Sequence, residues 1–250
     1  MKNTQNYNLT FDKVIQRAKD TIESLDLKSQ QEIVGQLNHG KALLSTNQQL
    51  NAYLYRYGKI HQAKLYQAFE HIPCKLWIEG NISIVDYGSG QGVAEMVLSD
   101  YMRNKHLEID AVKDITLIEP SYISLCKSLY YLRNFYINAD MVDICKSANM
   151  LSMDDISPKS QFVLHVFSNV IELEYFNIRH IANLLNEDVS HNNIILCVSP
   201  FYQECTRGKR MDLFGSYLKN YNRVYRFQAH TDNWKKDYSC QIQIFESLYY

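Results

Sequence analysis

Three kinds of segment are missing from this chain of 250 residues, and each absence excludes a class of protein. No apolar run approaches the roughly 18–20 residues that span a bilayer, so we expect neither a transmembrane helix nor a membrane partner. The polar start of the chain, residues 1–8, lacks the apolar stretch of a secretory signal. The six cysteines contain no CxxC pair, which argues against a zinc site and against a redox motif. These absences predict a cytoplasmic protein with reduced thiols and no bound metal.

The net charge of −1 gives no strong overall attraction to nucleic acid. The charge is nevertheless uneven, because residues 201–250 carry eight Lys and Arg residues against five Asp and Glu residues. Such an imbalance fits a basic rim around the mouth of an active site, and it also fits ordinary scatter of charge.

The hydrophobic pattern changes its period once along the chain. Apolar residues recur at helical spacing over 10–25, 30–44 and 46–72, which predicts three helices. From residue 82 onward, short β-branched runs alternate with helical segments, which is typical of a parallel sheet with helices on both faces. The expected strands are 82–86, 114–119, 142–145, 162–167 and 193–199, with helices to 103, over 121–135, over 171–186 and near 211–221.

The last two alternating runs, 224–228 and 239–245, have no helix between them and should form an antiparallel hairpin. The expected architecture is therefore α/β: a Rossmann-like, seven-stranded, mostly parallel sheet with a C-terminal antiparallel hairpin. We expect residues 1–75 to form an N-terminal helical extension or lid, and residues 76–250 to form the main domain.

A glycine-rich turn follows the first expected strand. Glycines there let the backbone bend tightly and let a ligand approach without interference from a Cβ atom. In open parallel sheets, ligands bind outside the carboxyl ends of the strands, beside this first turn. A dinucleotide fingerprint has the form G-x-G-x-x-G, and Val93 occupies its last position, which disfavours a nicotinamide-dependent oxidoreductase. The turn reads Asp86-Tyr87-Gly88-Ser89-Gly90-Gln91-Gly92.

This acid-x-G-x-G-x-G pattern, between a strand and a helix, resembles the first motif of class I S-adenosylmethionine-dependent methyltransferases. The resemblance extends over about 82–245 and includes the terminal hairpin. It implies that residues 86–92 bind the cofactor S-adenosyl-L-methionine. It also implies that Glu119, followed by Pro120 at the end of the second strand, accepts hydrogen bonds from both ribose hydroxyls. A carboxylate suits this role because it accepts two donors at once.

The resemblance adds candidates at the end of the 162–167 strand. Phe167, Ser168 and Asn169 would border the methionine part of the cofactor. Asn169 with Glu172 three positions on also reads as a capping box for the next helix. Asp154 and Asp155 could bind the adenine amino group, or they could be ordinary acids of a polar loop.

One helix just before the first strand combines Tyr57, Gly58 and His61 within a turn of one another. A histidine among core residues is usually structural, but this combination is odd for packing alone. We therefore hypothesise that this helix face closes over the cofactor or substrate. Transfer from a sulfonium requires alignment and no obligatory acid or base. The catalytic residues thus stay open, with His61, His165 and Asn169 as candidates and the two histidines able to take a proton.

The sequence predicts an S-adenosylmethionine-dependent methyltransferase whose acceptor could be RNA, DNA, protein or a small molecule. The basic C-terminal segment slightly favours nucleic acid. The alternative is a non-catalytic binding module that keeps the methyltransferase-like fold. The basic residues of the segment include Arg207, Lys209, Arg210, Arg223, Arg226, Lys235 and Lys236.

Overall fold

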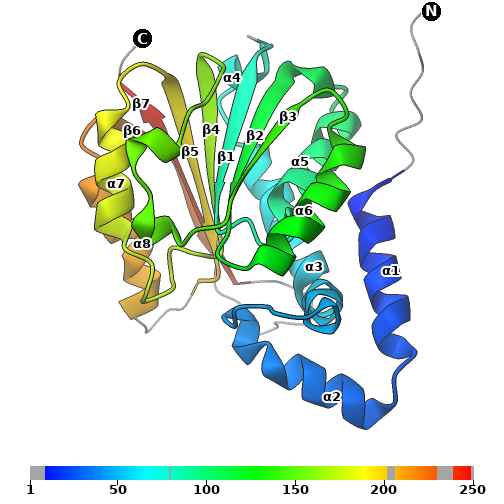
Figure 1. Cartoon of the computed structure of the whole chain (residues 1–250). Coiled ribbons are helices and arrows are strands. Elements are labelled where there is room, and N and C mark those ends of the chain that lie inside the picture. Colours follow the sequence, from blue (N-terminus) through cyan, green and yellow to red (C-terminus); the bar gives the residue numbers. More distant parts are fainter. Residues whose placement is uncertain (1–8, 79, 202–205, 230–238, 249–250) are drawn as a thin grey trace, which may run out of the picture.

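The computed structural model describes residues 9–78, 80–201, 206–229 and 239–248, and of residues 206–208 it describes only the backbone (Figure 1). The chain begins with α1 (Phe11–Glu23), α2 (Leu27–Gln36) and α3 (Asn47–Phe69). Each starts at a polar residue whose side chain accepts a backbone N–H of the first turn, as N-caps do. These caps are Thr10, Asp26 and Thr46.

The second helix ends at Gln36, so its expected extension to residue 44 is wrong. Asn38, His39 and Gly40 have φ values of 45°, 55° and 83°, and consecutive left-handed residues cannot continue a right-handed helix. The chain instead crosses beneath the carboxyl ends of the strands as an irregular segment, residues 40–44, before α3 begins (Figure 1).

The seven-stranded sheet has the expected architecture, with strand order β3-β2-β1-β4-β5-β7-β6. Strands β1 to β5 run parallel, whereas β7 pairs antiparallel with both β5 and β6. The strands are β1 (Ile82–Tyr87), β2 (Val112–Ile118), β3 (Asp140–Ile144), β4 (Phe162–Ser168), β5 (Asn192–Ser199), β6 (Tyr221–Ala229) and β7 (Cys240–Ser247).

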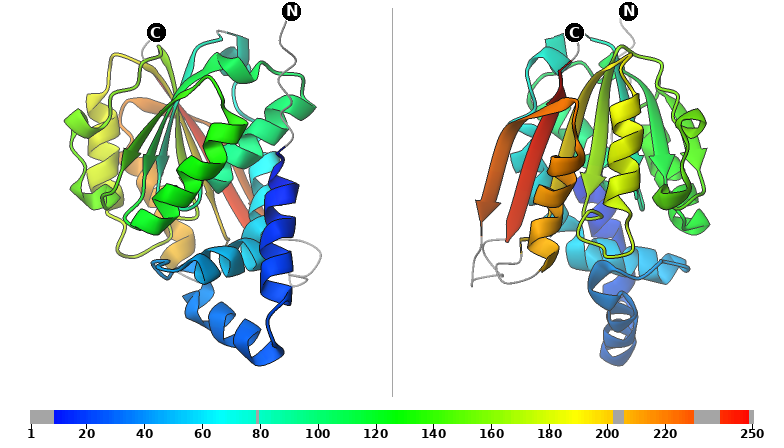
Figure 2. Two further views of the ribbon diagram at one scale, coloured as in Figure 1. Left: turned by 45° about the vertical axis from the view of Figure 1, so that its right-hand side comes forward. Right: turned by 90° about the vertical axis from the view of Figure 1, so that its left-hand side faces the viewer.

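Helices cover both faces of the sheet (Figure 2). On one face α5 (Val93–Asn104) and α6 (Tyr122–Phe135) lie with α3 and α1, and on the other face lie α7 (Ile178–Glu187) and α8 (Thr206–Tyr217). Right-handed crossovers between parallel strands produce this division. Shorter helices are α4 (Lys75–Ile78) and the 3₁₀ turns η1 (Asn38–Gly40), η2 (Ile109–Ala111), η3 (Ala148–Met150) and η4 (Met153–Asp155).

Helix α3 shares its hydrophobic core with the sheet. Leu54, Leu65 and Phe69 belong to the same buried cluster as Ile84 of β1 and Ile194 of β5. A smaller cluster joins α1, α2 and α3. Because α3 is anchored in the main core, its residues hold fixed positions relative to the strand ends. Within the described residues, no helix is both long and apolar enough to cross a bilayer.

The helix after β4 begins later than expected. Its N-cap is Asn177, whose Oδ1 accepts the N–H of His180 at 3.1 Å. The capping box expected from Asn169 and Glu172 is wrong, because Asn169 has a φ of 60° where an N-cap is extended. The Glu172 carboxylate instead accepts the hydroxyl of Ser199 at 2.6 Å.

Candidate functional site

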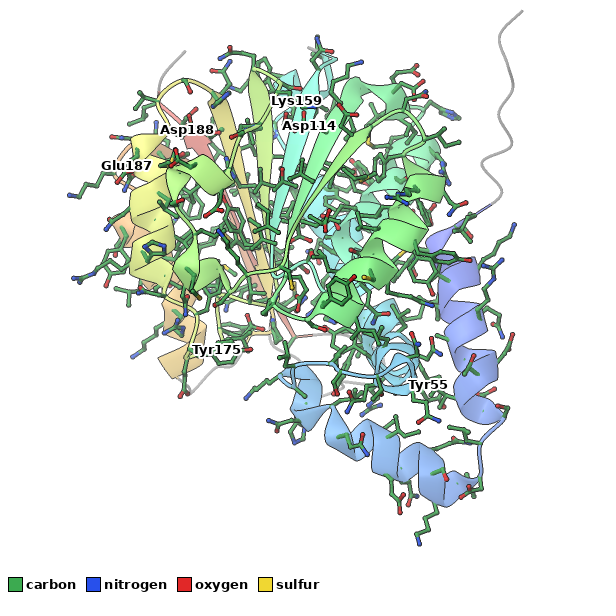
Figure 3. The ribbon with its side chains drawn as sticks, in the orientation of Figure 1. Tyr55, Asp114, Lys159, Tyr175, Glu187 and Asp188 are labelled. Atoms are coloured by element: carbon green, nitrogen blue, oxygen red, sulfur yellow. The ribbon has the colours of Figure 1, made fainter. Side chains whose placement is uncertain are left out.

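A cleft opens at the carboxyl ends of β1, β2 and β4. It encloses about 1060 Å³, a volume that includes the open space at its mouth. The turn after β1, Tyr175, Phe176 and residues 40–44 all line it (Tyr175 is labelled in Figure 3). The cleft therefore lies where open parallel sheets bind their ligands.

The glycine turn is bent by left-handed residues and fastened to the neighbouring strand. Gly88, Gly90 and Gly92 have φ values of 78°, 55° and 72°. The N–H groups of Gly88 and Ser89 donate to the carbonyl of Ile118 at 2.8 and 3.1 Å. A Cβ on Gly88 would lie 2.5 Å from Cγ1 of Val170, whereas a Cβ on Gly90 would meet nothing within 4 Å. The space above Gly90 is thus open to a ligand.

The Glu119 carboxylate lies at the end of β2, facing this turn. One oxygen accepts the N–H of Gly90 at 3.0 Å and the other accepts the N–H of Ser121 at 2.8 Å. The side chain is 8% exposed and lines the cleft, and burial raises its pKa. Since a carboxylate oxygen accepts more than one hydrogen bond, each oxygen keeps acceptor capacity toward the cleft.

Two further acids are buried beneath the turn. Asp86 is 1% exposed and Glu95 is 0% exposed, and no donor among the described residues reaches Asp86 Oδ1 or either oxygen of Glu95. Burial raises the pKa of Asp86 well above its ordinary value, and the negative charge of Glu95 raises it further. Burial likewise raises the pKa of Glu95 to about 7. Two close buried carboxyl groups cannot both ionise cheaply, so we expect the pair to hold one proton near neutral pH.

A hydrogen-bonded chain joins α3 to the end of β4. Lys64 Nζ donates to Asn169 Oδ1 at 2.8 Å, and Asn169 Nδ2 lies 3.0 Å from His61 Nδ1. His61 Nε2 lies 3.0 Å from the hydroxyl of Tyr53, and Asn169 Nδ2 lies 2.9 Å from Ser168 Oγ. Burial, followed by the charge of Lys64, lowers the pKa of His61 well below its ordinary value, so this ring is neutral at pH 7.

Comparison with known proteins gives matches in structure alone. No protein-family model and no curated protein matches the sequence. The structure of the small RNA methyltransferase HEN1 aligns with a TM-score of 0.52 at 13% identity, covering 76% of this chain and 26% of that chain.

The fold is that of the class I methyltransferases.

Other structures align at lower TM-scores. The plantazolicin methyltransferase BpumL in complex with SAH matches at 0.49 and 12% identity over 92% of this chain and 99% of that chain. The N-methyltransferase NodS from Bradyrhizobium japonicum WM9 matches at 0.48 and 11% identity over 77% of this chain and 97% of that chain.

Most residues that the sequence assigned to the cofactor border the cleft of this methyltransferase fold. Gln91 contributes in addition a hydrogen bond from its side-chain amide to the carbonyl of Leu50, at 3.0 Å, which ties the turn to α3. The expected residues that line the cleft are Asp86, Gly88, Ser89, Gly90, Gln91, Glu119, Pro120, Ser168 and Asn169, together with His61.

Three expected cofactor residues do not line the cleft. Tyr87 and Phe167 stack on each other in the core with ring centroids 4.4 Å apart. Successive side chains on a strand point to opposite faces of the sheet. Tyr87 therefore points away from the side of Asp86, and Phe167 points away from the side of Ser168. Gly92 packs against α6, where a Cβ would lie 3.0 Å from Leu132. The expectation that Tyr87, Gly92 and Phe167 bind the cofactor is corrected to this extent: none of the three lines the cleft.

His165 also lies away from the cleft. Its Nδ1 is 3.2 Å from the hydroxyl of Tyr87, and its Nε2 is 2.9 Å from Asn193 Oδ1. Burial lowers its pKa to about 4. A neutral imidazole with both nitrogens hydrogen-bonded inside the sheet has a structural role. The prediction that His165 could act as a base at the cleft is therefore wrong.

The two acids considered for adenine lie outside the cleft as well. Asp155 pairs with Lys146 at 2.5 Å and accepts the N–H of Ser152 at 2.9 Å. Neither Asp155 nor Asp154 borders the cleft, whose edge here is residues 147–149. Both acids lie in the short η4 helix, which is separate from the cleft.

The sequence places Tyr53 and Lys64 on the helix expected to close over the cleft, but it gives neither residue an individual role. Lys64 is 4% exposed. A lysine on an otherwise apolar helix face is the feature of the sequence that could have indicated a role for it. The contribution of residues 40–44 to the cleft was missed because the second helix was predicted to extend to residue 44. The sequence Asn38-His39-Gly40 could have indicated that the helix ends earlier.

The basic C-terminal segment is partly neutralised by internal contacts. Arg210 donates to the carbonyls of Ile171 and Phe176 at 2.8 and 2.6 Å. Arg223 and Arg226 pair with Asp212 at 3.3 and 2.9 Å. The side chain of Arg207, and Lys235 and Lys236 entirely, lie outside the described residues. The described arginines therefore have structural partners of their own.

Proposed function

We propose that this protein is an S-adenosylmethionine-dependent methyltransferase. The observation that carries the proposal is the Glu119 carboxylate, which two backbone N–H groups hold at the edge of the open space above Gly90. A carboxylate with spare acceptor capacity beside an unobstructed glycine turn fits an adenosyl ligand with two ribose hydroxyls.

The residues of the cleft would divide the work of binding. Glu119 would accept hydrogen bonds from the ribose hydroxyls. Residues 88–91 would let the ligand approach the protein backbone closely. Ser168 and Asn169 would border the amino-acid end of the ligand. When bound, the cofactor supplies a methyl group on a positively charged sulfur, which is a good leaving group. The protein then needs to align donor and acceptor and to exclude water.

Residues 1–75 would serve as the lid of this site. The carbonyl of Leu44 accepts the hydroxyl of Ser121 at 2.5 Å, and the carbonyl of Leu50 accepts the Gln91 amide. Both bonds join the lid to residues that border the cofactor positions. The lid would therefore cover the cleft with residues 40–44 and α3 and shield the transferred group from solvent.

The test combines cofactor binding with methyl transfer. Calorimetry should give saturable binding of S-adenosylmethionine to the wild type, and Glu119→Gln should weaken it about 10- to 100-fold because charge-assisted hydrogen bonds are lost. The matched control is Glu187→Gln, an exposed acid at the end of α7 on the other face (labelled in Figure 3). Absence of binding by the wild type would overturn the proposal.

Radiolabelled cofactor incubated with RNA, DNA, protein and small-molecule pools then separates the enzyme from a non-catalytic module. Incorporation of label that is lost in Glu119→Gln supports the enzyme. Tight binding with no incorporation into any pool supports the module.

A further inference from the structure

Lys64 fixes the orientation of the Asn169 amide. A lysine ammonium has three donors and no acceptor, so the atom that meets it must be an acceptor. The group 2.8 Å from Lys64 Nζ is therefore the carbonyl oxygen of Asn169. The Asn169 backbone is held as well, through its N–H bond to the carbonyl of Val198 at 2.7 Å and its φ of 60°. Asn169 thus has one orientation in which its amide can serve Lys64.

The rest of the chain follows from that orientation. With its oxygen turned to Lys64, Asn169 presents its two N–H donors to His61 Nδ1 at 3.0 Å and to Ser168 Oγ at 2.9 Å. His61 Nδ1 must then be the unprotonated nitrogen, so the proton of the neutral ring lies on Nε2. That N–H donates to the hydroxyl oxygen of Tyr53 at 3.0 Å.

Two hydroxyl protons are left over at the end of this chain. Tyr53 and Ser168 each accept a hydrogen bond through oxygen, and both border the cleft. Burial raises the pKa of Tyr53, so its hydroxyl keeps its proton at neutral pH. Each hydroxyl therefore points a donor toward a ligand and has part of its acceptor capacity already used.

We propose that Lys64 is a positioning residue, which sets the polarity of the chain Lys64–Asn169–His61–Tyr53 so that this end of the cleft binds a carboxylate through hydroxyl donors. The carboxylate is that of the amino-acid part of the cofactor, and this assignment rests on the function proposed above. The polarity itself rests only on the side chains present. His61 acts within the chain as a relay of hydrogen-bond direction, since both of its ring nitrogens are occupied.

The first test reads the histidine tautomer without any ligand. Ring ¹⁵N chemical shifts, assigned by their loss in His61→Asn, should report the Nε2–H tautomer of His61 in the wild type. Lys64→Met should give a mixture of tautomers, because the amide of Asn169 is then free to flip. Lys64→Arg, which keeps a donor, should restore the single tautomer. An Nδ1–H tautomer in the wild type, or an unchanged one in Lys64→Met, would overturn the proposal.

The second test identifies the ligand group. Tyr53→Phe should weaken binding of S-adenosylmethionine about 5- to 20-fold and leave binding of its decarboxylated analogue unchanged. Tyr55→Phe removes a hydroxyl from the same helix outside the cleft and should change neither affinity (Tyr55 is labelled in Figure 3). Equal losses for both ligands, or no loss for either, would overturn the carboxylate assignment. If the wild type binds neither ligand, the proposed function fails, while the tautomer result still decides the polarity.

Discussion

The backbone N–H of Gly90 donates a hydrogen bond of 3.0 Å to the carboxylate of Glu119, 29 residues further along the chain. This bond joins the turn after β1 to the end of β2, and it orients the carboxylate toward the cleft. The same turn is tied to β2 by the two bonds to Ile118. The conformation of the glycine turn and the orientation of the Glu119 carboxylate therefore depend on each other, and a substitution in either should alter both.

Gly88→Ala should destabilise the protein more than Gly90→Ala. Both positions have left-handed φ values, which cost a non-glycine residue about 1–2 kcal/mol. Only at Gly88 does the added Cβ also meet a neighbour, Val170, at 2.5 Å, and such overpacking costs about a further 1–3 kcal/mol. Urea denaturation of the two variants measures the difference. Equal losses of unfolding free energy would contradict the geometry of the turn.

The buried acid pair should make stability depend on pH. The folded-state pKa of Glu95 is about 7 against an ordinary value of 4.5, so its stabilising protonated form is fully present below about pH 4.5. Its contribution is lost as the pH rises through 7, by up to about 3 kcal/mol. Glu95→Gln should reduce this loss and flatten the stability profile between pH 5 and 8, leaving the part that the buried Asp86 contributes. A profile that stays as steep in the variant would show that Glu95 is not the titrating group.

Asn177 and Glu172, which both follow β4, offer a contrast in capping. Asn177→Ala should cost about 1 kcal/mol, because its side chain caps α7. Glu172→Gln should leave the helix start intact, since Glu172 bonds to Ser199 and not to a helix N–H. Denaturation combined with far-ultraviolet circular dichroism of each variant checks this. Loss of helix content in Glu172→Gln alone would restore the earlier capping box.

Local sequence signals predicted the fold well. The turn from Asp86 to Gly92 lies within one contiguous segment, and the alternation of β-branched and helical runs predicted a mostly parallel sheet with helices on both faces, which the structure has. The antiparallel pairing of β6 and β7 was predicted from two alternating runs of sequence with no helical pattern between them. Such features depend on near neighbours in the chain, which a sequence displays directly.

The parts that escaped prediction depend on distant contacts. The hydrogen bond from Lys64 to Asn169 joins residues 105 positions apart in the sequence, and no periodicity of the sequence predicts it. Glu172 reads as a capping residue until Ser199, 27 residues away, is seen to bond to it. Tyr87 and Phe167 were assigned to the cofactor through the resemblance to the family's motifs, although strand alternation turns both side chains into the core.

The central claim is that Glu119 binds ribose hydroxyls, and one thermodynamic cycle tests it most directly. Calorimetry would compare S-adenosylhomocysteine with an analogue lacking both ribose hydroxyls, for the wild type and for Glu119→Gln. The account predicts that removing the hydroxyls weakens binding to the wild type about 10-fold or more and changes binding to the variant far less. An equal loss in both proteins would show that Glu119 does not contact the sugar and would contradict the account.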